Sequence, residues 1–184
     1  MEKSFIKYLD DYEVGLALNT IEKFFWNFCD DYIEIVKHRL YRPEEFGEIS
    51  RYSGQKTIYI ILYKLLQNFS IYFPFITEEI YQGIFKENIS VHLTEIKSLE
   101  YNFEEEIKYG DMIAEIISHV RGEKTNNNVS LKTEVEQISI LAESKLKDAI
   151  AASTKDFKAT LFINELNLSP TESNFEIEYI ELKK

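Results

Sequence analysis

The chain has 184 residues, of which 45% are hydrophobic and 14% aromatic, so it can bury a sizeable core and is not expected to be disordered. Its formal net charge of −11 argues against an independent nucleic-acid-binding protein, because affinity for phosphate comes mainly from Lys and Arg. The single cysteine excludes an intramolecular disulfide and a cysteine-based zinc site, and no apolar run approaches the roughly 18 residues of a membrane span, so a cytoplasmic protein without membrane contact is expected.

Residues 12–42 are predicted to form one long helix, preceded by a short lead-in that can itself be helical. Apolar residues recur every three or four positions from Val14 to Val36, as on a helix that buries one face. The opposite face carries Asn19, Lys23, Trp26, Asp30 and Lys37. Trp26 stands there among polar residues, so either another helix covers it, which we favour, or a flat aromatic ligand does. Pro43 follows the end of the helix.

The rest of the first half is predicted to complete a helical bundle over residues 1–100. Residues 44–54 have the composition of a polar loop with a short helical turn, and residues 55–73 form a second, central helix. Pro74 ends or kinks that helix. Thr77 is the predicted N-cap of a third helix, because Glu78 and Glu79 would then lie in its first turn.

Residues 101–184 are predicted to form a small α+β unit of three strands and two helices, which makes the chain mainly α. The composition changes at residues 101–106. A helix is expected over 104–123, a loop over 124–128, and a strand with one phase shift over 129–141. Ser144 can cap a helix that runs to about residue 156, and strands follow at 159–166 and 175–182 on either side of a turn at 169–173.

Three segments also carry a family resemblance. Residues 24–41, FFWNFCDDYIEIVKHRLY, contain an aromatic-x-Trp-x-Phe-Cys-Asp-x-Tyr-Ile-Glu-x-x-Lys pattern; residues 74–81 read Pro-Phe-x-Thr-Glu-Glu-x-Tyr; residues 121–131 contain Arg-x-x-Lys and then Ser-Leu. This resembles the anticodon-binding domain of class I valyl-, isoleucyl- and leucyl-tRNA synthetases. The order and spacing of the segments favour valyl-tRNA synthetases of the archaeal-like type. Residues 90–96 resemble the family's exit strand but lack its Trp-Pro pair, and Lys132 stands where Asn is usual.

The resemblance implies a helical bundle that binds the anticodon region of a tRNA, with valine tRNA as the expected partner. It also implies the C-terminal fragment of a larger valine–tRNA ligase, whose catalytic domain would be the second partner. The chain contains no P-loop, no GxGxxG run and no pair of His at metal-ligand spacing, and its three His stand in no class I signature. We therefore expect no catalytic residue, cofactor or metal within it.

A tRNA site needs cations for phosphates and planar groups that stack on unpaired bases. The candidates are Asn19, Lys23, Trp26, Asp30 and Lys37 on the polar helix face, Arg39, Tyr41, Arg42 and Arg51 after it, and Arg121, Lys124, Asn127 and Lys132 in the second unit. Positions 37 to 64 contain six Lys and Arg and three Glu, which gives a net charge of +3. This is the one clearly basic region of the chain. The alternative is a solvated helix end whose cations interact with the helix dipole.

The sequence also allows two other functions. The chain could be a helical module for protein–protein interaction, which its negative charge and apolar surface would suit. It could also be the same region of an isoleucyl- or leucyl-tRNA synthetase. A continuous basic surface near residues 37–51 would favour RNA, whereas a broad exposed apolar patch would favour a protein partner.

Overall fold

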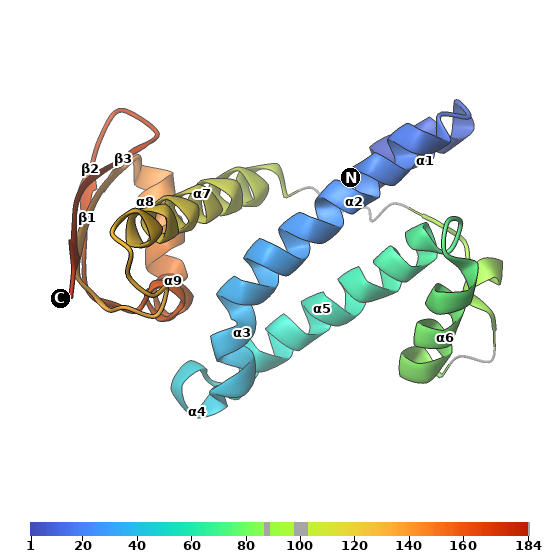
Figure 1. Ribbon diagram of the computed structural model, residues 1–184, viewed down its shortest axis with the longest axis horizontal. Coiled ribbons are helices and arrows are strands. Elements are labelled where there is room, and N and C mark those ends of the chain that lie inside the picture. The colour runs from blue at the N-terminus through green and yellow to red at the C-terminus, as the bar shows by residue number, and fades with distance from the viewer. Residues whose placement is uncertain (87–88, 98–102, 184) are drawn as a thin grey trace. The chain divides into compact units, whose positions relative to one another are not determined.

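The computed structural model describes residues 1–86, 89–97 and 103–183. Its contacts divide the chain into two compact units, one of Met1–Glu34 with Pro43–Tyr101 and one of Ile35–Arg42 with Asn102–Lys184. The first is helical and the second contains a three-stranded sheet, which confirms the predicted fold class (Figure 1). The predicted boundary between residues 100 and 101 lies outside the described residues, and the division into domains 1–100 and 101–184 stays a prediction.

The first unit is built from helices that pack in pairs. Its elements are α1 (Glu2–Asp10), α2 (Val14–Asn27), the π-helical turn η1 (Phe28–Tyr32), α4 (Pro43–Phe46), α5 (Glu48–Phe69), α6 (Pro74–Phe85) and the 3-10 turn η2 (Val91–Leu93). The helix α3 (Ile33–Tyr41) continues from η1, and most of it belongs to the second unit. α1 packs on α2, while α2 and α6 pack on α5. The buried side chains include Phe5, Ala17 and Ile21 in one cluster and Leu66 and Tyr81 in another. No helix among the described residues is long and apolar enough to cross a membrane.

The predicted long helix is present but contains the π-helical turn η1. A π-helical turn holds one extra residue, which rotates everything after it by roughly 100° relative to a regular helix. The turn lies at the aromatic run, where the Phe24, Phe28 and Tyr32 rings stack with centroids 6.4 and 5.5 Å apart. The prediction that Trp26 and Lys37 share one helix face assumes regular geometry, which this turn interrupts, and it stays a prediction.

Three other expectations for the first unit need correction. α5 begins at Glu48, so most of the predicted loop 44–54 is helical. α6 begins at Pro74, whose missing N–H costs nothing in the first turn of a helix. Thr77 is therefore not an N-cap but lies inside α6, where its hydroxyl donates to the Phe73 carbonyl at 2.8 Å. The predicted exit strand at 90–96 contains η2 instead.

The second unit places three helices on one face of its sheet (Figure 1). Its elements after the end of the long helix are α7 (Glu104–Asn126), β1 (Val135–Ala142), α8 (Ser144–Ala152), α9 (Thr154–Leu161), β2 (Ile163–Pro170) and β3 (Phe175–Leu182). The strand order is β2-β1-β3, with β1 parallel to β2 and antiparallel to β3. Residues from α7, β1 and α8, among them Ile116, Ile138, Ile140 and Leu146, form the buried core.

The local chemistry of this unit explains where its predicted boundaries shift. α7 continues to Asn126, so the predicted loop 124–128 is mostly helical. The predicted helix 144–156 is two helices, and Ser144 is the first helical residue after the cap Glu143. α9 ends where Phe162 adopts the left-handed conformation, with φ 58°, so β2 starts at Ile163. The predicted phase shift in β1 is confirmed by an irregular register between Val135 and Gln137.

Candidate nucleic-acid interface

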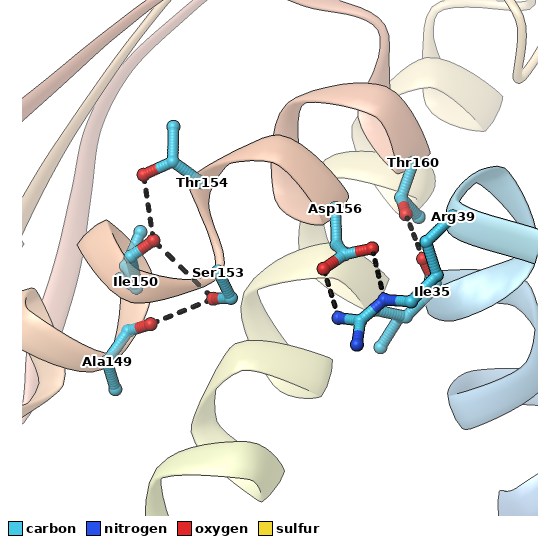
Figure 2. A network of polar contacts seen from close by, with 8 residues as sticks. All are labelled: Ile35, Arg39, Ala149, Ile150, Ser153, Thr154, Asp156 and Thr160. Carbon is cyan, nitrogen blue, oxygen red and sulfur yellow. Dashed lines mark hydrogen bonds and ion pairs between the residues drawn. The ribbon is translucent and has the colours of Figure 1, made fainter. Parts of the chain in front are cut away.

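A bidentate ion pair fastens the end of the long helix to α9 (Figure 2). The Nε of Arg39 donates to Oδ1 of Asp156 at 3.0 Å, and Nη2 of Arg39 donates to Oδ2. Asp156 lies in the first turn of α9, where the helix dipole favours a carboxylate. Its exposed fraction is only 5%. The Arg39 charge, which was predicted to face phosphate, is engaged by a carboxylate of the same unit.

A second, uncharged contact accompanies this pair. The Thr160 hydroxyl donates to the Ile35 carbonyl at 3.3 Å, and the Ile35 side chain packs against the core of the second unit. At the corner between α8 and α9, the hydroxyls of Ser153 and Thr154 donate to carbonyls in the last turn of α8 at 2.8 and 3.0 Å (Figure 2). These bonds satisfy backbone carbonyls at the C-terminal end of α8, directly before α9 begins.

The His38 ring of α3 and the Lys124 ammonium of α7 both meet the Phe162 ring. The His38 and Phe162 rings meet edge to face with centroids 6.2 Å apart, and Nη2 of Arg42 donates to Nδ1 of His38 at 2.6 Å. The Nζ of Lys124 lies 5.6 Å from the Phe162 centroid. Arg121 is close enough to act on the ionisation of Lys124. Three predicted candidates from two distant segments, Arg42, Arg121 and Lys124, therefore contribute to one basic cluster.

The structure corrects the prediction that Lys124 is available for contact with tRNA. It is fully buried, and its Nζ donates to the carbonyls of Leu131 and Leu161 at 3.1 and 2.7 Å. Burial of the ammonium, and then the Arg121 charge, lower the pKa of Lys124 to about 8. Because no surface of this side chain reaches solvent, it cannot meet a phosphate in this conformation. It joins α7 to the segments before β1 and at the end of α9.

The other candidates of the second unit lie at or near its surface. Tyr41, at the end of α3, is 81% exposed, and Lys37 on the same helix is half-buried. Asn127 and Lys132, beyond the end of α7, are exposed. An exposed tyrosine beside half-buried cations offers a ring for stacking and charges for phosphate, which is the combination that unpaired nucleotides require.

The candidates on α2 and η1 form a separate, exposed group in the first unit. Asn19, Lys23 and Asp30 are exposed, and Trp26 is 53% exposed with its ring 5.2 Å from that of Phe25. This exposure favours the interpretation of Trp26 as a contact residue over the interpretation as a packing residue. Arg51, near the start of α5, is half-buried, and its Nη1 lies 3.8 Å from a carboxylate oxygen of Glu48.

The second recognised motif has a structural role in this chain. The Glu78 carboxylate accepts hydrogen bonds from the Gln82 amide at 2.9 Å, the Ser90 hydroxyl at 2.8 Å and the Val91 backbone N–H at 2.9 Å. The bond from Gln82, followed by those from Ser90 and Val91, lowers the pKa of Glu78. Glu78 thus holds the turn η2 against α6.

Sequence reasoning missed Asp156, Thr160 and Phe162, which organise the end of the long helix. Asp156 and Arg39 are 117 residues apart, and no local pattern links them. One indirect signal was available: an acidic residue in the first turn of a helix beside a serine and a threonine often marks a helix start. Within the described ranges, no group of three or more His, Cys, Asp or Glu could hold a metal ion.

Comparison with known proteins gives one consistent result. Residues 1–140 match the family described as the anticodon-binding domain of tRNA ligase. The chain is 32% identical over 181 residues to the valine–tRNA ligase of Pyrococcus furiosus, covering 95% of this chain and 20% of that protein. It is 30% identical over 167 residues to that of Methanopyrus kandleri, with 90% and 18% covered, and 36% identical over 135 residues to that of Rickettsia rickettsii, with 72% and 16% covered. The chain thus spans about a fifth of the length of these curated relatives.

Proposed function

The chain belongs to the family of anticodon-binding domains of tRNA ligases, and we propose from this membership that it binds the anticodon region of valine tRNA. In this proposal it is one portion of a valine–tRNA ligase and supports aminoacylation without carrying out the chemistry. The sequence contains none of the nucleotide-binding signatures that valine activation by a class I enzyme would use.

The observation that carries the proposal is the basic cluster at the end of the long helix. In a chain with net charge −11, electrostatic affinity for RNA requires a local concentration of cations. Arg42, which contacts His38, and Arg121 supply one, and the exposed Tyr41 ring lies on α3 with His38. We call these residues, together with Lys37 and Lys132, the RNA edge. We assign them to contacts with the phosphates and unpaired bases of the anticodon loop.

The experiment is a salt titration of the binding of the full chain to a synthetic RNA stem-loop with a valine anticodon, followed by fluorescence anisotropy. Replacing both Arg42 and Lys132 by Gln should flatten the dependence of log affinity on log salt by up to about 2 units, since each lost phosphate contact removes about 1. The control replaces Lys3 and Lys7 of α1, outside the candidate set, by Gln. It makes the same change in charge and should leave the slope unchanged.

Two further results bear on the same proposal. A stem-loop with a non-valine anticodon should bind more weakly, and equal binding would reduce the proposal to RNA binding without valine specificity. The chain alone should show no valine-dependent exchange of pyrophosphate into ATP. Detectable exchange would overturn the assignment of catalysis to another part of the ligase.

An exposed apolar surface at the α5–α6 corner supports a second partner. Ile71, Phe73, Phe75 and Ile76 are all exposed, Phe75 almost completely. Exposed apolar patches of this kind mark protein contacts. Because the curated relatives are about five times longer than this chain, we assign the patch to the remaining part of the ligase, including its catalytic domain.

A further inference from the structure

We propose that Asp156 is a positioning residue for RNA binding, and that Arg39 acts on RNA through Asp156 and not by contact with phosphate. The inference rests on the proposed function and adds a residue that neither the family resemblance nor the basic region indicated. It gives the second unit a task at the RNA site, which is to hold the end of the long helix in place.

The Arg39 guanidinium is engaged by the Asp156 carboxylate. Two of its nitrogens, Nε and Nη2, donate to the two oxygens of one carboxylate. The side chains of Arg39 and Asp156 are only 21% and 7% exposed. A bidentate pair of this kind fixes both distance and orientation. The pair is also neutral as a whole, so Arg39 adds no charge that could release counterions from RNA.

The contact between α3 and α9 has two points in register. On α3 the contacting residues are Ile35 and Arg39, four positions apart, and on α9 they are Thr160 and Asp156, also four apart. Residues spaced by four lie on the same face of a helix. The pairing of 35 with 160 and 39 with 156 means that the two helices run in opposite directions. Two such contacts restrict both sliding and rotation of α3 on α9.

This restriction reaches the part of the proposed RNA edge that lies on α3 or directly after it, Tyr41 and Arg42. Arg42 follows Arg39 by three residues and Tyr41 by two, so any rotation of α3 changes where both point. The His38 ring, which accepts from Arg42, is held by Phe162 immediately after α9. α9 and the residue after it therefore set the position of the cations and the ring that the proposal assigns to RNA.

The sign of one mutational effect tests this inference. Asp156→Asn removes a negative charge, and simple electrostatics predicts tighter RNA binding. Positioning predicts weaker binding, because the pair with Arg39 is lost. We expect Asp156→Asn and Arg39→Gln each to weaken binding of the valine stem-loop by a similar factor in the salt titration, and the double variant to be no weaker than either. The double exchange Arg39→Asp with Asp156→Arg should recover part of the affinity.

Two controls separate positioning from loss of folding and from charge. Glu105→Gln breaks the exposed pair with Lys145 in the same unit and makes the same change from carboxylate to amide, so binding should not weaken. Thr160→Val removes only the hydroxyl that contacts the Ile35 carbonyl and should weaken binding less, in the same direction. Circular dichroism at the assay temperature verifies that each variant is folded. If Asp156→Asn is not folded, the binding of Thr160→Val tests the inference instead.

The outcomes distinguish this inference from the proposed function. If the wild-type chain binds the RNA but Asp156→Asn binds as tightly or more tightly, Arg39 and Asp156 do not act as a positioning pair. The same conclusion follows if Arg39→Gln lowers the salt slope by about 1 unit, since Arg39 would then contact phosphate. If the wild-type chain does not bind the RNA at all, the proposed function and the positioning role both fail.

Discussion

Replacement of the buried Lys124 by Met should change how the stability of the chain depends on pH. Lys124 has a folded-state pKa of about 8, against 10.5 for a solvated lysine, because its ammonium is buried and the Arg121 charge lies near it. Below about pH 8 it is charged in both states, and folding bears the full cost of burying the charge. As the pH rises from about 8 to about 10.5, the unfolded chain holds more protons than the folded chain, so stability rises.

The expected magnitude follows from the difference between the two pKa values. Each unit is worth about 1.36 kcal/mol, so a shift from 10.5 to about 8 corresponds to about 3 kcal/mol at most. The Met variant has no such titration. It also leaves the carbonyls of Leu131 and Leu161 without their Nζ donor, which costs about 1–3 kcal/mol for each unsatisfied group. That loss does not depend on pH, so the predicted quantity is the difference in pH dependence.

The assay is urea unfolding followed by far-ultraviolet circular dichroism, on the wild type and Lys124→Met at several pH values from about 7 to about 10.5. The single tryptophan, Trp26, lies in the first unit and would not report on the second. Relative to the variant, the wild type should gain up to about 3 kcal/mol over this range. Parallel pH profiles for the two proteins would refute the burial of a charged ammonium at this position. Other titrating groups cancel in the comparison.

Three further predictions follow from single side chains. Phe28→Ala should lower the free energy of unfolding by about 3–5 kcal/mol, because Phe28 is 7% exposed and stacks between two rings; an unchanged urea midpoint would contradict its place in the core. Trp26→Ala should weaken binding of the valine stem-loop by about 1–3 kcal/mol with little change in melting temperature, and the opposite pair of results would identify Trp26 as a packing residue. Glu78→Gln should lower the free energy of unfolding at pH values above the unfolded pKa of glutamate, and the difference from wild type should shrink as the pH falls through the lowered pKa of Glu78. Urea midpoints measured from neutral to acidic pH test this prediction. A difference that stays constant with pH would contradict it.

Much of the fold could be predicted because its signals are local. The apolar spacing from Val14 to Val36 predicts the long helix, and the alternation from residue 175 predicts β3. The aromatic-Trp and Pro-Phe-x-Thr-Glu-Glu patterns predict the family, which the match over residues 1–140 confirms. These features depend on residues within one or two turns of each other, so one sequence is enough to find them.

The remaining features depend on contacts or on energies that a local pattern does not contain. The π-helical turn at Phe28–Tyr32 changes helix phase without any Pro or Gly to mark it. Lys124 looks like a surface cation at a helix end, and its burial follows from carbonyls 7 and 37 residues away. Arg39 likewise looks like a phosphate contact until Asp156 is placed beside it. For the candidate site, the sequence predicted a basic region but not which cations the fold already uses.

The second unit is assembled from two separated stretches of chain, and this affects how the protein can be made and divided. During synthesis the helix end around Arg39 leaves the ribosome 117 residues before Asp156, so it cannot dock until residue 156 has emerged. A protein fragment ending at residue 101 would keep that helix end but lack α9. The complementary fragment would contain Asp156 but lack Arg39, the partner that engages both of its carboxylate oxygens. The two halves should therefore be expressed together, as fragments that complement each other through α3.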